Sequence, residues 1–306
     1  MKRGKAFTLI EVLVGVAILA ILGLVIVQII TATLSASRMS NAGIDAAAQA
    51  RLAFDRLGID LAAMVRRPDI DFQSTSSFGA APPYGLLFVS GVMAAGVGGT
   101  NNRGYSLVGY QVNVTTDTPT PCLLRGAIPI AWQGTNAVGV TGYETNGLPV
   151  SLTSIGVTLS LGDFDVLAPA VIRVVVGYQL YPSGNSVSLS DGTSLQALGQ
   201  VVYSPPVRLD SEENPSSMTD LSCVSSLIVG VVAIDPDAVK RLKASEVAAL
   251  AASFPVPSAG QYPVALWSPI AENASGLPAG VPLFARQSVR VFQRAFPINP
   301  YGAPRQ

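Results

Sequence analysis

The chain has 306 residues, of which 49% are hydrophobic and 12% are charged, and it contains no histidine. Histidine is the most common general base, so its absence excludes histidine general-base catalysis. It also excludes the Ser-His-Asp triad and histidine metal sites. Lys plus Arg and Asp plus Glu balance at 19 each, and no basic patch suited to nucleic acid is present. The composition therefore argues against nucleic-acid binding and against histidine-dependent catalysis.

An apolar run extends from Phe7 to Ile30, behind a short leader that contains Lys2, Arg3 and Lys5. About 24 residues at ~1.5 Å rise per residue are long enough to cross a bilayer as a helix. No Lys or Arg follows until Arg38. The positive-inside bias therefore predicts a cytoplasmic N-terminus, with the bulk of the chain on the other side of the membrane.

One carboxylate, Glu11, lies inside this run, about one turn from its start. A charge costs ~2.5–3.5 kcal/mol at the centre of a membrane helix on insertion scales, and usually has a partner there. The small residue Ala6 precedes the run, whereas an ordinary secretory signal carries its small-residue cleavage site after a shorter apolar core. Cleavage at Ala6 would therefore leave the apolar helix on the mature protein.

Residues 5–12, Lys-Ala-Phe-Thr-Leu-Ile-Glu-Val, resemble the class III signal of type IV pilins and type II secretion pseudopilins. The resemblance implies that a prepilin peptidase cuts between Ala6 and Phe7 and methylates the new N-terminus at Phe7. It also implies that Glu11 pairs with the N-terminal amine of a neighbouring subunit, an ion pair in low dielectric. Ala6 departs from the family pattern, where Gly is more usual. The alternative is an uncleaved signal anchor with an incidental glutamate.

The same resemblance implies a structural protein without cofactor or catalytic residues. Its partners would be other pilin-like subunits, the prepilin peptidase, the assembly platform and the inner membrane, with the head in the periplasm. It would then enter a type IV pilus or a type II secretion pseudopilus, at or near the tip. Two other hypotheses are an adhesive or ligand-binding module on the same helix and a periplasmic enzyme on a signal anchor.

Helical periodicity continues beyond the apolar run. Apolar residues at three- and four-residue steps predict one buried face, formed by Ala47, Ala50, Phe54, Leu57, Leu61 and Met64. Two i,i+4 pairs, Arg51–Asp55 and Arg56–Asp60, are expected on the other faces. The polar stretch 35–43 is expected to be a flexible point or the exit from the membrane.

After Pro82 the pattern changes to short strands separated by Gly, Pro, Ser and Asn. Strands are expected at 84–92, 105–115, 150–161, 170–180, 200–209, 225–234 and 287–296. Alternation in the second predicts a half-buried strand. Residues 171–176 are apolar on both faces except for Arg173, which predicts a central, largely buried strand.

One further helix is expected at 235–253, capped by Asp235, with Pro236 at its first position. It is expected to pack on the sheet, and a docking helix is the alternative. The predicted fold class is α+β, a long N-terminal transmembrane helix followed by a mostly antiparallel β head with this one additional helix. The predicted organisation is a leader at 1–6, a helix at 7–67 that Pro68 ends and whose membrane part is 7–30, and a head at 68–306.

The two cysteines and three acidic stretches are further candidates for a disulfide and for metal binding. Cys122 and Cys223 could form a disulfide in an oxidising periplasm or remain two buried thiols. Acidic residues at 69–71, 210–213 and 235–237 could cap turns or bind calcium, and capping is the more common role. Neither a Gly-x-Ser-x-Gly elbow nor a Walker loop is present, and no metal site is predicted.

Within the pilin superfamily the chain is most similar to J-type minor pseudopilins and PilW-like minor pilins. Three stretches carry this resemblance: Arg-Leu-x-x-Asp-Arg-Leu-x-x-Asp-Leu at 51–61, Gly-Leu-Leu-Phe-Val-Ser at 85–90, and a Tyr-containing strand at 109–125 that ends in Cys-Leu-Leu-Arg. The head also resembles the prepilin-like C proteins of the Verru_Chthon cassette. These similarities imply a low-copy subunit.

Overall fold

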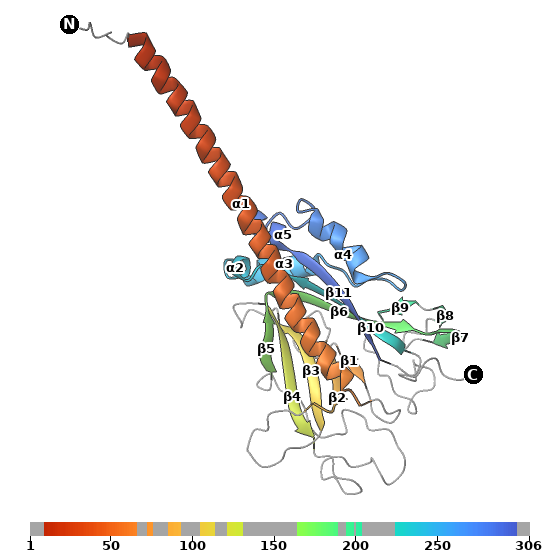
Figure 1. The fold of residues 1–306 in the computed structure, drawn as a ribbon. Coiled ribbons are helices and arrows are strands. Elements are labelled where there is room, and N and C mark those ends of the chain that lie inside the picture. Colours follow the sequence, from red (N-terminus) through yellow and green to blue (C-terminus); the bar gives the residue numbers. More distant parts are fainter. Residues whose placement is uncertain are drawn as a thin grey trace, which may run out of the picture.

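The computed structural model describes residues 9–65, 72–75, 85–92, 105–113, 121–130, 164–188, 194–198, 200–203 and 224–298. A long N-terminal helix, α1 (Leu9–Ala62), is followed by antiparallel sheets and short helices (Figure 1). The strands are β1 (Gln73–Thr75), β2 (Gly85–Ser90), β3 (Tyr105–Asn113), β4 (Cys122–Ile130), β5 (Phe164–Pro169), β6 (Val171–Leu180), β7 (Pro182–Ser188), β8 (Ser194–Leu198), β9 (Val201–Val202), β10 (Val224–Ala233) and β11 (Arg290–Pro297). The short helices are α2 (Pro236–Val239), α3 (Ala244–Ala252), α4 (Pro263–Glu272) and α5 (Leu283–Ser288). The predicted α+β class is confirmed.

The strands form a five-stranded sheet in the order β1-β2-β3-β4-β5, a four-stranded sheet in the order β11-β10-β6-β9, and the hairpin β7-β8. Ala170 joins the two large sheets at a sharp corner between β5 and β6, with a positive φ of 64°. Its N–H donates to the Pro121 carbonyl and its own carbonyl accepts from Ile234 N–H, so the strained corner is tied to both sheets.

Helix α1 runs without a break through residues 35–43, so this stretch does not interrupt the helix, and the alternative of an exit from the membrane stays a prediction. The hydroxyl groups at the start of this stretch and just before it donate to carbonyl groups about one turn earlier: Thr31 to Val27, Thr33 to Ile29, and Ser35 to Ala32. These polar groups are therefore satisfied inside the helix and do not compete with it.

The helix ends at Ala62, five residues before the expected end at Arg67. Beyond it the chain pairs with the end of β2. Val65 N–H donates to the Val89 carbonyl at 2.9 Å, and Gly91 N–H donates to the Ala63 carbonyl at 2.8 Å. Pro68 by itself would let the helix continue to Arg67. Hydrogen bonds between the backbone and β2 take the place of that last helical turn.

The second half of α1 packs on both large sheets. Its buried face confirms the predicted stripe from Ala50 onward, but Ala46 is buried in place of Ala47, which is exposed. Around this face lies one hydrophobic cluster, which includes side chains of β2, β3, β6 and β10.

Strand β3 is buried from Ser106 to Gln111 on both faces, so the prediction of a half-buried strand was wrong.

The four-stranded sheet is the central layer of this part of the head. Its other face is covered by α2 to α5, which enclose a second cluster around Trp267 and Phe254. Strand β6 is buried on both faces, as predicted, and Arg173 is only 6% exposed. Ile172 belongs to the second cluster and Val174 to the first, because the β6–β10 register shifts between Val171, which pairs with Ala233, and Arg173, which pairs with Val232.

The expected helix at 235–253 is two helices. Asp235 caps α2 by accepting the Asp237 N–H, as predicted, but the chain turns at residues 240–243 and starts again as α3. The Glu246 carboxylate accepts the Lys243 N–H at 2.7 Å and so fixes the new start. Helices α4 and α5 were missed because proline residues punctuate both, at Pro263, Pro269 and Pro282.

The remaining strand predictions have mixed outcomes. Strands β2, β3, β6 and β10 confirm four predicted segments within one or two residues at each end. The segment 287–296 begins inside α5 and becomes strand only at Arg290, whereas 200–209 is strand only at Val201–Val202 in its described part. Residues 150–161 lie outside the described residues, and strands β1, β4, β5, β7 and β8 were not predicted.

Candidate assembly segment and its anchorage in the head

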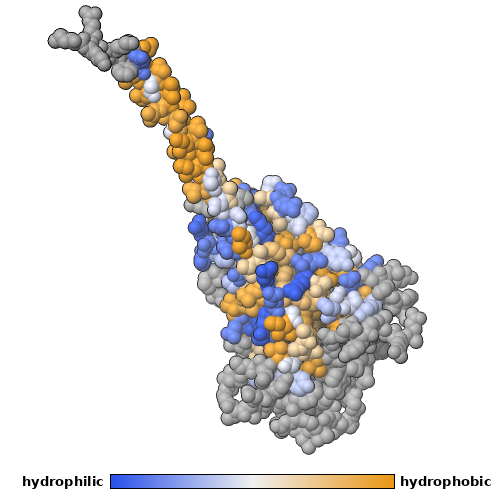
Figure 2. All heavy atoms as spheres, viewed as in Figure 1, coloured by the Kyte–Doolittle hydropathy of each residue, from blue (hydrophilic) through white to orange (hydrophobic). Residues whose placement is uncertain are grey.

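The first part of α1 projects from the head as a stalk, which we define as residues 9–37 (Figure 1). Its large apolar side chains from Leu9 to Leu34 are 45–85% exposed. Figure 2 shows a largely apolar surface along the face of the stalk that is in view. Among the residues that the structure describes, α1 is the one helix long and apolar enough to cross a membrane. The head leaves this surface uncovered, so its burial requires a bilayer or other protein chains.

The predicted processing and assembly residues lie at the tip of the stalk. Ala6 and Phe7 precede the described residues. Glu11 is exposed in the first turn of α1. A carboxylate in a first turn interacts favourably with the helix dipole, which offsets part of the cost of a charge in an apolar segment.

The other candidate residues lie in the head. Cys122 is a buried thiol at the start of β4, and burial raises the pKa of its thiol. Cys223 lies outside the described residues, so the disulfide stays a prediction.

In the acidic pair at 235–237, Asp235 is a helix cap and Asp237 pairs with Lys240 at 2.9 Å. The acidic stretches 69–71 and 210–213 lie outside the described residues, and within the described ones no three His, Cys, Asp or Glu side chains could hold a metal ion.

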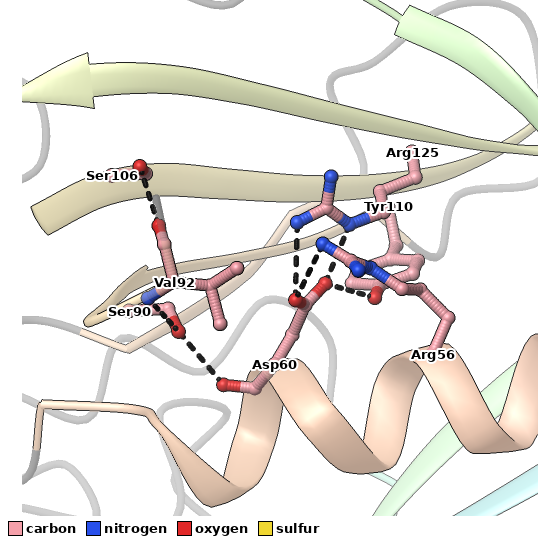
Figure 3. Close-up of polar contacts among 7 residues, drawn as sticks. All are labelled: Arg56, Asp60, Ser90, Val92, Ser106, Tyr110 and Arg125. Atoms are coloured by element: carbon pink, nitrogen blue, oxygen red, sulfur yellow. Dashed lines mark hydrogen bonds and ion pairs between the residues drawn. The ribbon is translucent and has the colours of Figure 1, made fainter. Parts of the chain in front are cut away.

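A buried charged cluster anchors the head end of α1 to the five-stranded sheet (Figure 3). We call it the Asp60 cluster; it consists of Arg56 and Asp60 from α1, Tyr110 from β3 and Arg125 from β4. Arg125 is bidentate to the Asp60 carboxylate, with Nε at 2.6 Å from Oδ2 and Nη2 at 3.0 Å from Oδ1. The Tyr110 hydroxyl donates to Oδ2, and Arg56 Nη2 lies 3.3 Å from Oδ1. The Asp60 side chain is fully buried, so its charge depends on these partners.

The electrostatics of the cluster follow from this burial. Burial, with the nearby Asp60 charge and hydrogen bond, raises the pKa of Tyr110 far above its ordinary value. For Arg125, burial acts to lower the pKa, but the hydrogen bond and charge of Asp60 outweigh it and raise the pKa. Tyr110 therefore stays a neutral donor and Arg125 stays a cation, and two guanidinium groups compensate the carboxylate.

The backbone of Asp60 is also tied to the sheet. Ser90 Oγ donates to the Asp60 carbonyl at 2.9 Å and accepts from Val92 N–H at 3.3 Å. Ser106 Oγ donates in turn to the Val92 carbonyl at 2.7 Å, so the last turn of α1 is linked through β2 to β3. The head end of α1 is therefore held to the five-stranded sheet by both side-chain and backbone bonds.

This cluster was not predicted, because the Arg56–Asp60 pair was expected on a face of the helix other than the apolar one. The pair does exist, but Asp60 points into the head, whereas Asp55 pairs across the surface with Arg294 at 2.9 Å. The available signal was the subfamily resemblance. Its first stretch contains Asp60, and its third contains both Tyr110 and Arg125.

Comparison with known proteins adds one match. Residues 1–27 match the prokaryotic N-terminal methylation motif, a prepilin signal of the type IV pilin kind. No curated protein and no solved structure matches the chain. The motif implies interaction with a prepilin peptidase and with other pilin subunits, and suggests a structural subunit rather than an enzyme. The apolar helix that carries it is consistent with membrane anchoring, so the chain carries a prepilin-type N-terminal segment on an α+β head.

Proposed function

We propose that the protein is a structural subunit of a type IV pilus or type II secretion pseudopilus. The observation that carries the proposal is the combination of the methylation motif with a stalk whose apolar surface is uncovered along its whole length. Before assembly the stalk spans the inner membrane with the head in the periplasm. In the filament the same surface is buried against the helices of other subunits.

Processing begins at the leader, residues 1–6. The prepilin peptidase cuts between Ala6 and Phe7 and methylates the Phe7 amine. Glu11 then pairs with the N-terminal amine of a neighbouring subunit as the assembly platform adds the chain to the filament. The position of Glu11 in the first turn of α1, exposed towards its surroundings, supports this role.

The head supports a low-copy position at or near the filament tip, in the manner of J-type pseudopilins and PilW-like pilins. It carries two large sheets and four short helices beyond α1, and such a head is bulky for a subunit repeated along a filament. The prediction is a subunit present at a small fraction of the major pilin. Abundance equal to the major subunit in purified filaments contradicts it.

Replacement of the carboxylate tests the assembly role. A Glu11→Gln variant keeps the size and polarity of the side chain but removes its charge. We expect the variant to be cleaved normally yet to be lost from purified filaments or tip complexes by at least about tenfold, the equivalent of ~1.4 kcal/mol. The control is the double variant Glu11→Gln, Gln28→Glu, which carries a carboxylate at another position of the stalk. It should not restore assembly if the position of the charge matters. Normal incorporation of Glu11→Gln refutes the pairing role.

A further inference from the structure

Helix α1 passes through three different surroundings along its length. The apolar surface of the stalk ends at Leu34, the last large apolar side chain before the head. Contact with the head begins at Gly43, where a Cβ atom would lie 3.6 Å from Arg290 Nε. We call the stretch between them, residues 35–43, the neck. It comprises the last three residues of the stalk and the six that follow, and it is about 14 Å long.

The neck is composed largely of residues that form helices weakly. Five of its nine residues are Ser35, Ser37, Ser40, Asn41 and Gly43. Serine and asparagine have a lower helix propensity than alanine, because their side chains compete for backbone hydrogen bonds. Glycine is lower still, because a helix costs its backbone the most entropy. The sequence of the neck therefore gives the helix little support of its own.

The surroundings of the neck add little to this support. In a bilayer, the backbone hydrogen bonds of the stalk have no water to compete with them. In the head, Ala46, Ala50 and Ala53 are at most 1% exposed and hold the helix against the sheets. The described side chains of the neck at residues 35–37, 40 and 41 are exposed instead. Most helical stability in proteins comes from the packing of an apolar face, which this part of α1 does not have in its described residues.

The hydroxyl groups at the start of the neck make their bonds within the helix. Thr33 donates to the Ile29 carbonyl and Ser35 to the Ala32 carbonyl, both at 2.8 Å. Such bonds do not connect α1 to the head, and they often bend a helix. The neck is thus the part of α1 where bending or local opening meets the least resistance.

We propose that the neck is a joint between the anchored stalk and the head. The neck is helical in the structure, and this helix opens and re-forms locally in the unassembled subunit. The head therefore turns relative to the stalk while each keeps its own structure. The inference rests on the proposed membrane anchorage, because the bilayer fixes one side of the joint. On assembly, the joint lets the head adopt the orientation that its neighbours in the filament require.

Hydrogen exchange of backbone amides tests the local opening. The full-length protein is reconstituted in phospholipid vesicles, and exchange is followed by mass spectrometry of peptides that cover α1. We expect the amides of residues 37–43 to exchange at least about tenfold faster than those of residues 46–62 and 13–30. Protection of the neck equal to that of residues 46–62 overturns the joint and leaves the anchorage standing. Fast exchange throughout residues 13–30 overturns the anchorage, and the joint with it.

Two matched variants separate helix stability from the loss of polar groups. One combines Ser35→Ala, Ser37→Ala, Ser40→Ala and Asn41→Ala, and the other carries glycine at the same four positions. Both lose the same side-chain groups, but alanine has the highest helix propensity and glycine one of the lowest. We expect exchange in the neck to be at least about tenfold slower in the alanine variant than in the wild type, and faster in the glycine variant. Equal exchange in the two variants overturns the proposal.

The distance across the neck reports the turning of the head. Spin labels are placed on non-natural side chains at Gln28 and Ile59, because the chain has two native cysteines. Both positions are exposed on α1, and a straight helix separates them by about 47 Å. In vesicles we expect the distance distribution of the wild-type neck to be at least about twice as broad as that of the alanine variant, with the excess at shorter distances. A wild-type distribution as narrow as that of the alanine variant indicates a rigid rod and overturns the proposal.

Discussion

Asp60 shows how one residue fixes the long helix to the head. Its carboxylate is fully buried and is held by a bidentate Arg125, the Tyr110 hydroxyl and Arg56. A buried ion pair contributes little relative to apolar residues of the same size, but removal of one partner leaves the other charge uncompensated. The cluster therefore determines where α1 attaches and makes that attachment sensitive to single substitutions.

An Asp60→Asn variant should lower the free energy of unfolding by about 3–5 kcal/mol, because Arg125 would remain largely buried without its counterion. Urea denaturation of the full-length protein in detergent measures this loss. Asp55→Asn is the matched control on the same helix, since Asp55 pairs with Arg294 at the surface and both side chains are at least half exposed. Its loss should stay below about 1 kcal/mol. Equal losses for the two variants would show that the Asp60 cluster is not the anchor.

The buried Tyr110 predicts a loss of stability in alkali. Because its pKa is higher in the folded protein than the ordinary value of 10.0, the unfolded chain releases its proton first as the pH rises. The stability from Tyr110 is thus complete below about pH 10 and is lost as the pH rises above that value. Unfolding free energies between pH 8 and 11 should show a shallower decline for Tyr110→Phe than for the wild type. A wild-type slope in Tyr110→Phe would contradict the assignment.

Residue-level features were only partly predictable from the sequence. Glu11 stood out because a charge in an apolar run is unusual and is visible without any tertiary information. Asp60 did not stand out, because its main partners Tyr110 and Arg125 lie 50 and 65 residues away. Local spacing offered Arg56 as a sufficient partner. Asp60 follows Ala53 by seven residues and Leu57 by three, so it lies along the edge of the same buried stripe, where an aspartate is not expected.

At the level of elements, α4 packs unusually close to the central sheet. At Gly230 of β10, a Cβ atom would lie 2.5 Å from Pro263 Cβ at the start of α4 and 3.1 Å from the Trp267 ring. The glycine lets the helix approach the strand, and Trp267 is held there by a 2.7 Å hydrogen bond from its indole N–H to the Pro255 carbonyl.

A Gly230→Ala variant should therefore force α4 outward and destabilise the head by about 1–3 kcal/mol. Near-ultraviolet circular dichroism of Trp267 and urea denaturation together report this change. Gly280→Ala is the control, because no atom lies within 4 Å of its Cβ position. A Gly230→Ala protein as stable as the control would mean that α4 does not pack as the structure shows.

Elements with a strong local signal were predicted well. The first part of helix α1 and most of strand β6 are apolar runs, the second part of α1 has helical periodicity, and β3 shows clear alternation, so their presence and type were evident. Helix α4 carries Pro269 in its interior, and α5 is only six residues long, so neither gives a helical pattern of usual length. Strand β4 begins after a proline and contains Pro129, which sequence rules treat as a sign against a strand. These elements are stabilised by tertiary packing rather than by their own sequence preference.

On the scale of the whole molecule, the chain combines a packed head with an uncovered apolar stalk. A Leu19→Lys variant places a charge near the middle of the stalk, at a cost of about 2.5–3.5 kcal/mol in a bilayer. Carbonate extraction should therefore release a larger fraction of this variant than of the wild-type protein, which should stay with the membranes. Ile44→Lys, at a 63% exposed position of the same helix beside the head, should stay with the membranes too. Retention of Leu19→Lys with the wild-type protein would argue against a spanning stalk.

The central claim is that the chain is a processed, pilin-like subunit. It is tested most directly by the intact mass and N-terminal sequence of the protein coexpressed with a prepilin peptidase that is active on a known substrate. The account predicts a chain that begins at N-methylated Phe7, having lost the six-residue leader. A chain that still begins at Met1 would contradict it and would leave a signal-anchored protein with an uncleaved leader.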